Sequence, residues 1–485
     1  MTASCQSLRS RIPFGTGHHS RDATIDCHLS NAGTVLEMRL RFAVIVRLGS
    51  WLSVAAAAAA LACAPRGPVA PPGPPSPTAA LGRLIRIGVV EAASSVTLGS
   101  SGDYAITERA TGRVLANGTN GAATISLAAP GVYRVVAAAA SAEVTEPVIV
   151  TSTTGIVTIN GRPYRGLGEV RVNSVGSLAG INELPMEQYL YGVVPRELGP
   201  NLFPQVEAQK VQAIAARTYA LSYIGRRAAD GYDLRATTDD QVYGGYSDEH
   251  AVSNSAIDAT RGIVLTHGGA MVLARYSSTS GGHTADNEES FAEGPVVYLR
   301  GVPDMPPASG AIYEASLEAF KSSPLITDLR QPAAPFSLGR PRYHRWTFEW
   351  SAAELTSVIS TFARRNVGTV RAINVLERGR SGRIISLEYV TDSGSFPATR
   401  GVIRSSLRFT NAAGALVNLP STLFFVEPVT QPGSNAPTAI RVYGGGFGHG
   451  VGMAQVGAVL MARTGRMHED ILAHYYQGTE LIKAY

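Results

Sequence analysis

Three stretches of this sequence contain residue types that could do chemistry, and the most unusual is "RVYGGGFGHGVGMAQVGAVLMA" at residues 441–462. Glycine accepts positive φ angles and lets a ligand approach the backbone closely. A glycine-rich turn that opens a helix also presents free N–H groups and the positive end of the helix dipole, which favour an anion or a polarised carbonyl. His449 lies in the middle of this turn. The pattern predicts either a ligand site or a tight structural turn around a packed histidine.

The same stretch has the outline of a dinucleotide-binding turn, but its context argues against NAD. That fingerprint needs a second strand after the helix and an acidic residue about 20 positions further on. Here we expect the helix from Met453 to Arg463, with Gly465 as its stop. The twenty residues after Gly465 leave no room for the rest of a doubly wound sheet. We therefore expect no cofactor.

The other two stretches contain a glutamate and a cluster of hydroxyls. In "YLYGVVPRELGP" (residues 189–200), Glu197 stands between apolar and turn residues. Partial desolvation there would raise its carboxyl pKa and make it a usable general acid, although a surface glutamate fits the same pattern. In "YSSTSGGHTADNEESF" (residues 276–291), hydroxyls, two glycines and His283 share one turn. This turn suits hydrogen bonding to a polar ligand, and an ordinary Ser/Gly loop fits equally.

The elements that must position these residues divide along the chain. Short β-type runs separated by Gly, Asn and Ser predict an all-β region from residue 83 to about 183. Helices are expected after Pro185 and after Pro204, the second with an apolar, small-residue face. A hairpin is expected around residues 267–269, and residues 305–440 are mixed α/β. The fold class is α+β, in which an N-terminal β-rich region leads into a mixed α/β part.

Composition excludes some classes of function. The chain has 485 residues, 45% of them hydrophobic and 16% charged, which is typical of a folded protein. The net charge is +5, but six arginines against three acidic residues in positions 1–62 account for +3 of it. The remaining charge is too small and too evenly spread to indicate a nucleic-acid partner. The three cysteines all lie at or before Cys63, so we expect no disulfide in the folded part.

The N-terminus indicates export. Basic residues after Met38 and an apolar run up to residue 62 predict a signal peptide over 38–62, which makes residues 1–37 a mis-assigned extension. "ALAC" ends in Cys63 and partly matches a lipoprotein cleavage motif, so a lipid anchor and a cleaved, unanchored chain stay as alternatives. The Pro-rich linker 63–82 is expected to be extended. The protein is thus expected in the periplasm or cell envelope.

Five blocks, in this order, resemble the SpoIID/LytB family, named for a sporulation protein and an amidase enhancer. They are "NELPMEQYLYGVVPRELG", "AQKVQAIAARTYAL", "YSSTSGGHTAD", "YLRGVPD" and "GHGVGMAQVGAVLMARTGRMHEDILAHYYQGTEL". The resemblance covers roughly residues 155–485. It implies a core with a central cleft whose first part is 155–304, interrupted by the insert 305–440 and completed by 441–485. Residues 83–154 would then be a β-rich N-terminal region, which either has a role of its own or completes the core.

The resemblance implies a peptidoglycan lytic transglycosylase that cuts the glycan between N-acetylmuramic acid and N-acetylglucosamine, preferably where stem peptides have been removed. The acid/base of the family is the Glu of the block matched by "VVPRELG", so the role falls on Glu197. Ordinary glycosidases pair two carboxyl groups. In a lytic enzyme the C6 hydroxyl of the substrate is the nucleophile, so one carboxyl group that acts as acid and then as base leaves a 1,6-anhydro end.

The resemblance also suggests which residues would bind substrate. Arg217 and Tyr219 would line or brace the cleft, the hydroxyl turn would bind sugar hydroxyls or acetamido groups, and the glycine turn would form the opposite wall and hold the lactyl carboxylate of muramic acid. The residues are Arg217, Tyr219, Ser280, Gly281, Gly282, Thr284, Gly448, His449 and Gln455. Some relatives bind zinc through a cysteine in the "SGG" block. Here that region has Ser277 to Ser280, so no metal is expected.

A second interpretation is a peptidoglycan-binding amidase enhancer that stimulates a partner wall hydrolase without cutting glycan. Retention of Glu197 in its matching block favours the enzyme. A purely structural wall protein is less consistent with so complete a set of motifs. In either case the expected partners are glycan strands, with a wall amidase added in the second.

Overall fold

The computed structural model describes residues 83–485 except residues 139, 305–315, 325, 332–342 and 434–435. The expected extension 1–37, signal peptide 38–62, linker 63–82 and Cys63 lie outside the described residues, as does part of the expected insert. Within the described part, no helix is both long and apolar enough to cross a lipid bilayer.

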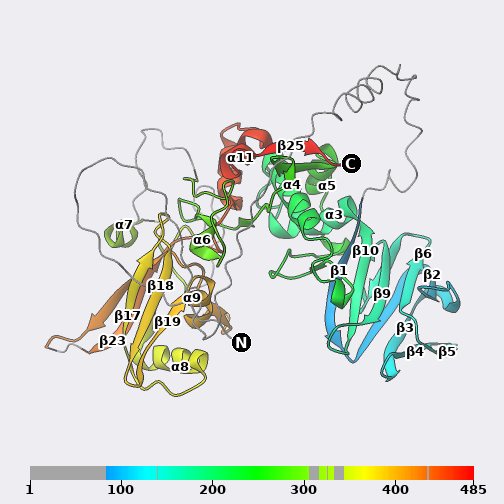
Figure 1. The fold of residues 1–485 in the computed structure, drawn as a ribbon, viewed down its shortest axis with the longest axis horizontal. Helices are drawn as coiled ribbons and strands as arrows, with labels where there is room; N and C mark the ends of the chain where they lie inside the picture. Colours follow the sequence, from blue (N-terminus) through cyan, green and yellow to red (C-terminus); the bar gives the residue numbers. More distant parts are fainter. Residues whose placement is uncertain (1–82, 139, 305–315, 325, 332–342, 434–435) are drawn as a thin grey trace, which may run out of the picture. The chain divides into compact units, whose positions relative to one another are not determined.

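An eleven-stranded sheet contains most of the first hundred residues described (Figure 1). The paired order is β11-β1-β10-β9-β6-β2-β3-β4-β5, and β7 pairs with β2 and β8. One face of each strand carries buried side chains such as Ile85, Ile87 and Leu98, as period-two alternation requires. The strands are β1 Leu84–Ala93, β2 Ser95–Glu108, β3 Val114–Ala129, β4 Val132–Ala137, β5 Ala140–Val144, β6 Val148–Ser152, β7 Ile156–Ile159, β8 Arg162–Arg165, β9 Leu167–Val172, β10 Leu178–Pro185 and β11 Leu234–Arg235.

The expected boundary between residues 154 and 155 falls inside this sheet. Strand β2 pairs with β7 across that boundary, and β1 pairs with β10 from Leu84 opposite Pro185. The β-rich region therefore continues to residue 185 and is one sheet with the expected start of the core. Local patterns show that strands exist, but they do not report which distant strands pair.

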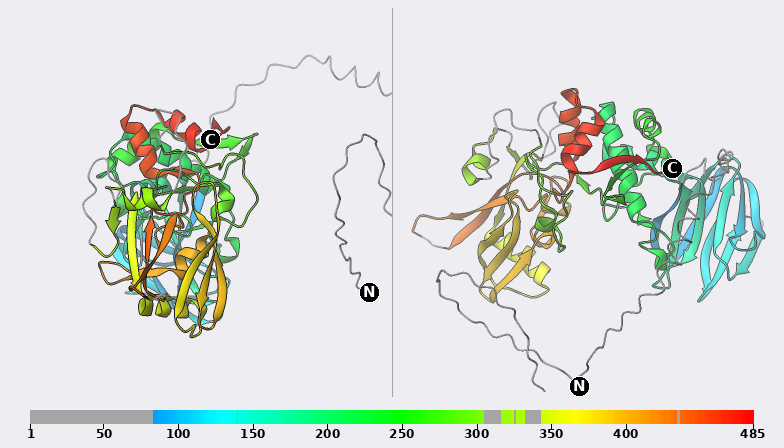
Figure 2. Two further views of the ribbon diagram at one scale, coloured as in Figure 1. Left: turned by 90° about the vertical axis from the view of Figure 1, so that its left-hand side faces the viewer. Right: turned by 45° about the horizontal axis from the view of Figure 1, so that its top comes forward.

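A helical layer follows the sheet directly. Helix α3 (Met186–Glu197) starts where β10 ends, with Pro185 at its N-cap, and α4 (Val206–Ser222) begins two residues after the expected Pro204. The neighbours of α4 are α3, α5 (Ala251–Ala259), α10 (Gln455–Arg463), α11 (His468–Tyr475) and β12 (Ile263–His267). Figure 2, right, shows the C-terminal helices in red beside the green ones. Helix α4 is buried on nearly all sides, and its many alanines allow this close packing.

Short elements complete this core. The expected hairpin forms as β12 and β13, and β25 pairs with the other edge of β12. The short strand β14 pairs in parallel with β24, which brings the hydroxyl stretch and the glycine-rich stretch together. The remaining bounds are η1 Ala228–Asp230, η2 Tyr246–Asp248, β13 Ala270–Met271, β14 Tyr276–Ser277, α6 Asn287–Ser290, β24 Met453–Ala454 and β25 Glu480–Lys483.

Residues 316–444, here called the insert domain, form a second β-rich unit with its own core. The sheets are β15-β16-β23-β22, β17-β18-β19 and β20-β21, packed around Trp346, Trp350 and Leu355. Helix α8 opens with a capping box between Ser351 and Glu354. The bounds are α7 Leu317–Lys321, β15 Ile326–Asp328, β16 Arg345–Ser351, α8 Ala352–Ala363, β17 Val370–Arg378, β18 Ile384–Thr391, β19 Gly394–Thr399, α9 Gly401–Ser406, β20 Arg408–Thr410, β21 Leu416–Asn418, β22 Phe424–Thr430 and β23 Pro437–Gly444. The α+β class expected from the sequence is confirmed.

Candidate functional site

Glu197 is the last residue of α3, and its side chain is partly buried. Its Oε1 accepts a hydrogen bond from the backbone N–H of Val242 at 2.9 Å, and its Oε2 accepts one from Nε2 of Gln455 at 3.3 Å. Burial raises the pKa of the Glu197 carboxyl, and the two hydrogen bonds oppose this shift without cancelling it. The side chain makes no ion pair within the described part of the chain. Glu197 therefore keeps its proton to a higher pH than an ordinary glutamate.

A cleft of about 770 Å³ opens at Glu197. Its lining comes from α3 and α4, from residues 238–242 and 275–278, from the glycine turn at 447–449, and from α9 and β21 of the insert domain. Of the residues that the sequence pointed to, the cleft brings together Glu197, Tyr219, Gly448, His449 and Gln455. Three of these, Gly448, His449 and Gln455, lie more than 250 positions from Glu197, so only the tertiary structure places them in the same cleft.

Gln455 joins three helices at the floor of this cleft. It is the first residue of α10 and is almost fully buried. Its Nε2 lies 3.3 Å from Oε2 of Glu197 on α3 and 3.2 Å from Oε1 of Gln212 on α4. A neutral amide at this position orients the glutamate and leaves it free to change charge.

Tyr219 lines the cleft from α4 within a cluster of aromatic rings. Its ring contacts those of Tyr223 and Tyr276 at centroid distances of 4.7 and 6.5 Å. The hydroxyl of Tyr276 accepts a 2.8 Å hydrogen bond from Gln241, whose Oε1 accepts one from Tyr189. Burial raises the pKa of Tyr219 and Tyr276 well above the ordinary value. These phenols stay neutral at physiological pH and offer apolar ring area with a polar tip.

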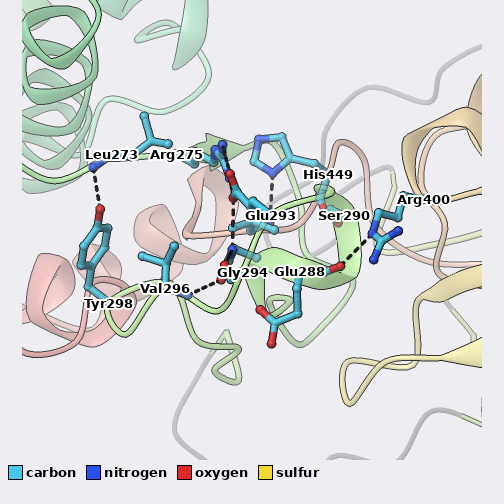
Figure 3. A network of polar contacts seen from close by, with 12 residues as sticks. Leu273, Arg275, Glu288, Ser290, Glu293, Gly294, Val296, Tyr298, Arg400 and His449 are labelled. Carbon is cyan, nitrogen blue, oxygen red and sulfur yellow. Dashed lines mark hydrogen bonds and ion pairs between the residues drawn. The ribbon is translucent and has the colours of Figure 1, made fainter. Parts of the chain in front are cut away.

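His449 lies in the wall opposite Glu197 and is held in place by its neighbours. Its ring packs on Phe291 at 5.2 Å, its Nδ1 accepts the N–H of Val451 at 3.0 Å, and its carbonyl accepts a hydrogen bond from Ser290. Figure 3 shows Ser290 and the Arg275–Glu293 pair beside it. Burial, followed by the nearby arginines, lowers the pKa of His449 to about 3. The imidazole is therefore neutral and does not act as a cation.

Several backbone N–H groups of the glycine turn donate hydrogen bonds within the protein. The N–H of Gly448 donates to the carbonyl of Pro420 at 2.9 Å, and that of Gly450 to Oγ of Ser277 at 3.1 Å. The first turn of α10 is also engaged, since the N–H of Val456 donates to the carbonyl of Ser278 at 3.0 Å. These three donors therefore have partners within the protein, and the expectation that the turn holds a sugar carboxylate at the helix N-terminus stays a prediction. The glycines also serve close packing: a Cβ on Gly448 (φ 109°) would lie 2.6 Å from that of Ser277.

Arg217 does not face the cleft, which corrects its assignment as a substrate-binding residue. Its side chain is fully buried and forms two hydrogen bonds with Glu187, at 2.9 and 2.7 Å. It also donates to the carbonyl of Ile263 at 3.0 Å. Arg217 therefore braces α4 against α3 and β12. An arginine on a buried helix face is expected to pair with a carboxylate. Glu187, in the preceding helix, is the sequence feature that could have indicated this pairing.

Within the hydroxyl turn, residues 280–284 anchor the insert domain and are absent from the cleft lining. Buried Arg383 donates to the carbonyls of Ser280 and His283 at 2.6 and 3.0 Å, and Arg345 donates to the carbonyl of Gly281 at 2.7 Å. The hydroxyl of Ser280 is bonded to Asp304. This placement corrects the sugar-binding assignments for four residues, which are buried or engaged in backbone contacts: Ser280, Gly281, Gly282 and Thr284. Their neighbours Ser277 and Ser278 line the cleft in their place.

The sequence analysis did not predict the arginines that line the cleft. Arg196, Arg226, Arg275 and Arg404 all line it. Three of them lie near motifs that the sequence singled out, but Arg404 belongs to the insert domain, where no local pattern marks it. Only the tertiary contact of that domain with the hydroxyl turn brings α9 to the cleft.

One group of side chains has the spacing of metal ligands. Ligand atoms of Glu207, His468 and Glu469 lie within 4.8 Å of one another, and Nδ1 of His468 is 2.7 Å from Oε2 of Glu207. A hydrogen bond between the first two accounts for this spacing. None of the three lines the cleft. The expectation that the cleft needs no metal stays a prediction.

Comparison with known proteins adds independent information. Residues 174–267, which include Glu197, match the family model described as Stage II sporulation protein (SpoIID). Residues 285–452, which include the insert domain and the glycine turn, match a domain of unknown function.

The chain is also similar to individual proteins. The chain is 30% identical over 311 residues to the amidase enhancer of Bacillus subtilis, a match that covers 60% of this chain and 40% of the relative. It is 25% identical over 330 residues to the stage II sporulation protein D of the same organism, covering 63% and 76%. An uncharacterized protein of Brachyspira hyodysenteriae is 28% identical over 336 residues, covering 69% and 76%.

Proposed function

Because the chain belongs to the SpoIID/LytB family, whose role is in the cell wall, we propose that it is a peptidoglycan lytic transglycosylase. Glu197 is the general acid and base. The substrate is the glycan strand, cut between N-acetylmuramic acid and N-acetylglucosamine where stem peptides are absent. Export to the periplasm or cell envelope is part of the proposal, because the glycan lies there.

The observation that supports the proposal most is the environment of the Glu197 carboxyl group, which raises its pKa. Glu197 opens into a cleft large enough for sugars, burial raises its pKa, and it has no cationic partner among the described residues. An acid whose pKa is raised keeps its proton to a higher pH, where it can protonate a leaving oxygen, and it can take a proton back once it is ionised. Gln455 and the N–H of Val242 hold the carboxyl group in place in both states.

The proposed reaction is balanced with this single group. Glu197 gives its proton to the glycosidic oxygen as the bond from C1 of the muramic residue to that oxygen breaks. The C6 hydroxyl of the same residue forms the new bond to C1, and its proton passes to the Glu197 carboxylate. The products are a strand ending in a 1,6-anhydro sugar and a strand with a free 4-hydroxyl, and no water is consumed.

Mass spectrometry of peptide-free glycan strands after incubation with the protein tests the proposal. We expect 1,6-anhydro ends with the native chain and none with Glu197→Gln, which keeps the shape of the side chain. Glu143→Gln is the matched control, since Glu143 is exposed and paired with Arg134 far along the first sheet, and it should leave the products unchanged. Anhydro products from the Glu197→Gln chain would refute the assignment of Glu197.

The name of the Bacillus subtilis relative supports one alternative, an amidase enhancer that binds glycan without cutting it. In that case no anhydro ends form, and a wall amidase works faster in the presence of the chain. Glu197→Gln would leave this stimulation intact.

A further inference from the structure

Arg404 lines the cleft, and no carboxylate of the described residues forms an ion pair with its guanidinium. Arg404 lies in α9 of the insert domain and is partly buried. Its Nε donates to the carbonyl of Leu419 at 2.9 Å, which fixes the plane of the group. Its two terminal nitrogens make no hydrogen bond within the described residues. They are also not fully buried, because atoms that are both buried and unpaired form a known set in the described residues, and these two nitrogens do not belong to it. Both are therefore open to the solvent of the cleft.

The other arginines of the cleft are neutralised. Arg196 lies 3.4 Å from Asp248, Arg226 lies 3.0 Å from Asp240, and Arg275 forms a two-point contact with Glu293. The charged neighbour of Arg404 is instead another cation, Arg383. Burial and this neighbour lower the pKa of Arg404, but a guanidinium remains protonated at physiological pH.

An uncompensated and partly desolvated cation raises the energy of the empty cleft, and an anionic ligand would relieve that cost. A planar guanidinium with two free terminal nitrogens matches a carboxylate best, because it can donate two parallel hydrogen bonds. The amides of Gly448 and Gly450 are engaged within the protein, and His449 adds no charge because its imidazole is neutral.

We propose that Arg404 binds the carboxylate of an acidic sugar in the cleft and so makes the protein select glycan strands in which the lactyl carboxylate of muramic acid is free. In strands that carry stem peptides this group is an amide, which cannot form the charged pair. The inference rests on the proposed function, since it names the group that the same cleft recognises. The insert domain, which lies within the match to a domain of unknown function, would then supply the residue that selects the substrate.

Binding measurements separate this inference from catalysis. Peptide-free strands with free carboxylates, and the same strands with the carboxyl groups reduced to alcohols, are titrated calorimetrically into the full chain bearing Glu197→Gln, which prevents cutting. We expect Arg404→Gln to weaken binding of the carboxylate strands about ten- to a hundred-fold, the usual range for a hydrogen-bonded charge pair. Binding of the reduced strands should not change. Arg404→Lys should fall between, because it keeps the charge and loses the paired geometry.

Arg371→Gln is the control, because Arg371 is an exposed arginine of the insert domain, paired with Asp392 and outside the cleft lining. It should bind both kinds of strand like the parent. Salt dependence gives a second measurement that needs no variant: affinity for the carboxylate strands should fall with added salt, and affinity for the reduced strands should not.

The inference is overturned if the parent chain, which carries Glu197→Gln and keeps Arg404, binds both kinds of strand with equal affinity. It is also overturned if Arg404→Gln lowers the affinity for both kinds of strand equally, since that result means a structural role. Failure of the parent chain to bind either kind of strand would overturn it as well. The proposed function fails separately, through the absence of anhydro products. Cutting of both kinds of strand with equal efficiency would leave the function standing and the inference refuted.

Discussion

The ion pair between Arg217 and Glu187 provides the sharpest test of how helix α3, which carries Glu197, is held. Both side chains are buried, with 0% and 1% of their side-chain surface exposed. Glu187 also accepts hydrogen bonds from the N–H of Gly262 at 3.1 Å and from the hydroxyl of Tyr485 at 2.6 Å. The perturbation is Arg217→Met, which keeps an unbranched stem and removes the charge and the donors.

The expected effect is a large loss of stability. The substitution leaves a buried carboxylate without its cation, which costs about 3–5 kcal/mol of unfolding free energy. At about 2–4 °C per kcal/mol for a domain of this size, the melting temperature should fall by roughly 6–20 °C. Scanning calorimetry measures this shift. Arg134→Met is the control, since its partner Glu143 is exposed and a surface pair is worth less than about 1 kcal/mol.

A second substitution separates a buried pair from a binding residue. Adding Glu187→Leu to Arg217→Met removes the stranded charge, so the double variant should be more stable than Arg217→Met alone. Below its melting temperature Arg217→Met should still bind glycan strands. A variant that melts like the parent but no longer binds glycan would refute this reasoning, and would return Arg217 to the substrate-binding role that the sequence suggested.

Three further predictions concern the cleft. Burial raises the pKa of Glu197, so the native state holds that proton more tightly than the unfolded chain does. The free energy of unfolding should therefore fall as pH rises from the ordinary glutamate pKa through the raised one. Calorimetry should find Glu197→Gln more stable than the parent at pH 8 and equal to it near pH 4. Gln455→Leu removes a hydrogen bond that favours the carboxylate, so the alkaline limb of kcat/KM for glycan cleavage should move to higher pH, and an unmoved limb would contradict the contact at 3.3 Å. Gly448→Ala should cost about 1–3 kcal/mol in urea unfolding, from a positive φ and a clash with Ser277, whereas Gly465→Ala, with positive φ and open space around it, should cost less.

Local chemistry along the sequence determined many of the elements of this protein. The hairpin at residues 267–269, the capped helix after Ser351 and the helix after Pro185 follow from turn residues, caps and periodicity, which act over a few positions. The residues around Glu197 fit a surface glutamate equally well, so the resemblance of the whole block, and not its local pattern, singled out this acid.

Tertiary structure alone decided what surrounds that acid. Whether Arg217 or Arg404 faces the cleft depends on carboxylates and backbone groups that pack against it from other elements, and a single sequence does not report these distances. The hydroxyl turn illustrates the same limit, because its polar residues suit a ligand or an anchor equally, and the buried Arg383, about a hundred positions away, made it an anchor. Side-chain type sets which interactions are available, and the packing of distant segments selects among them.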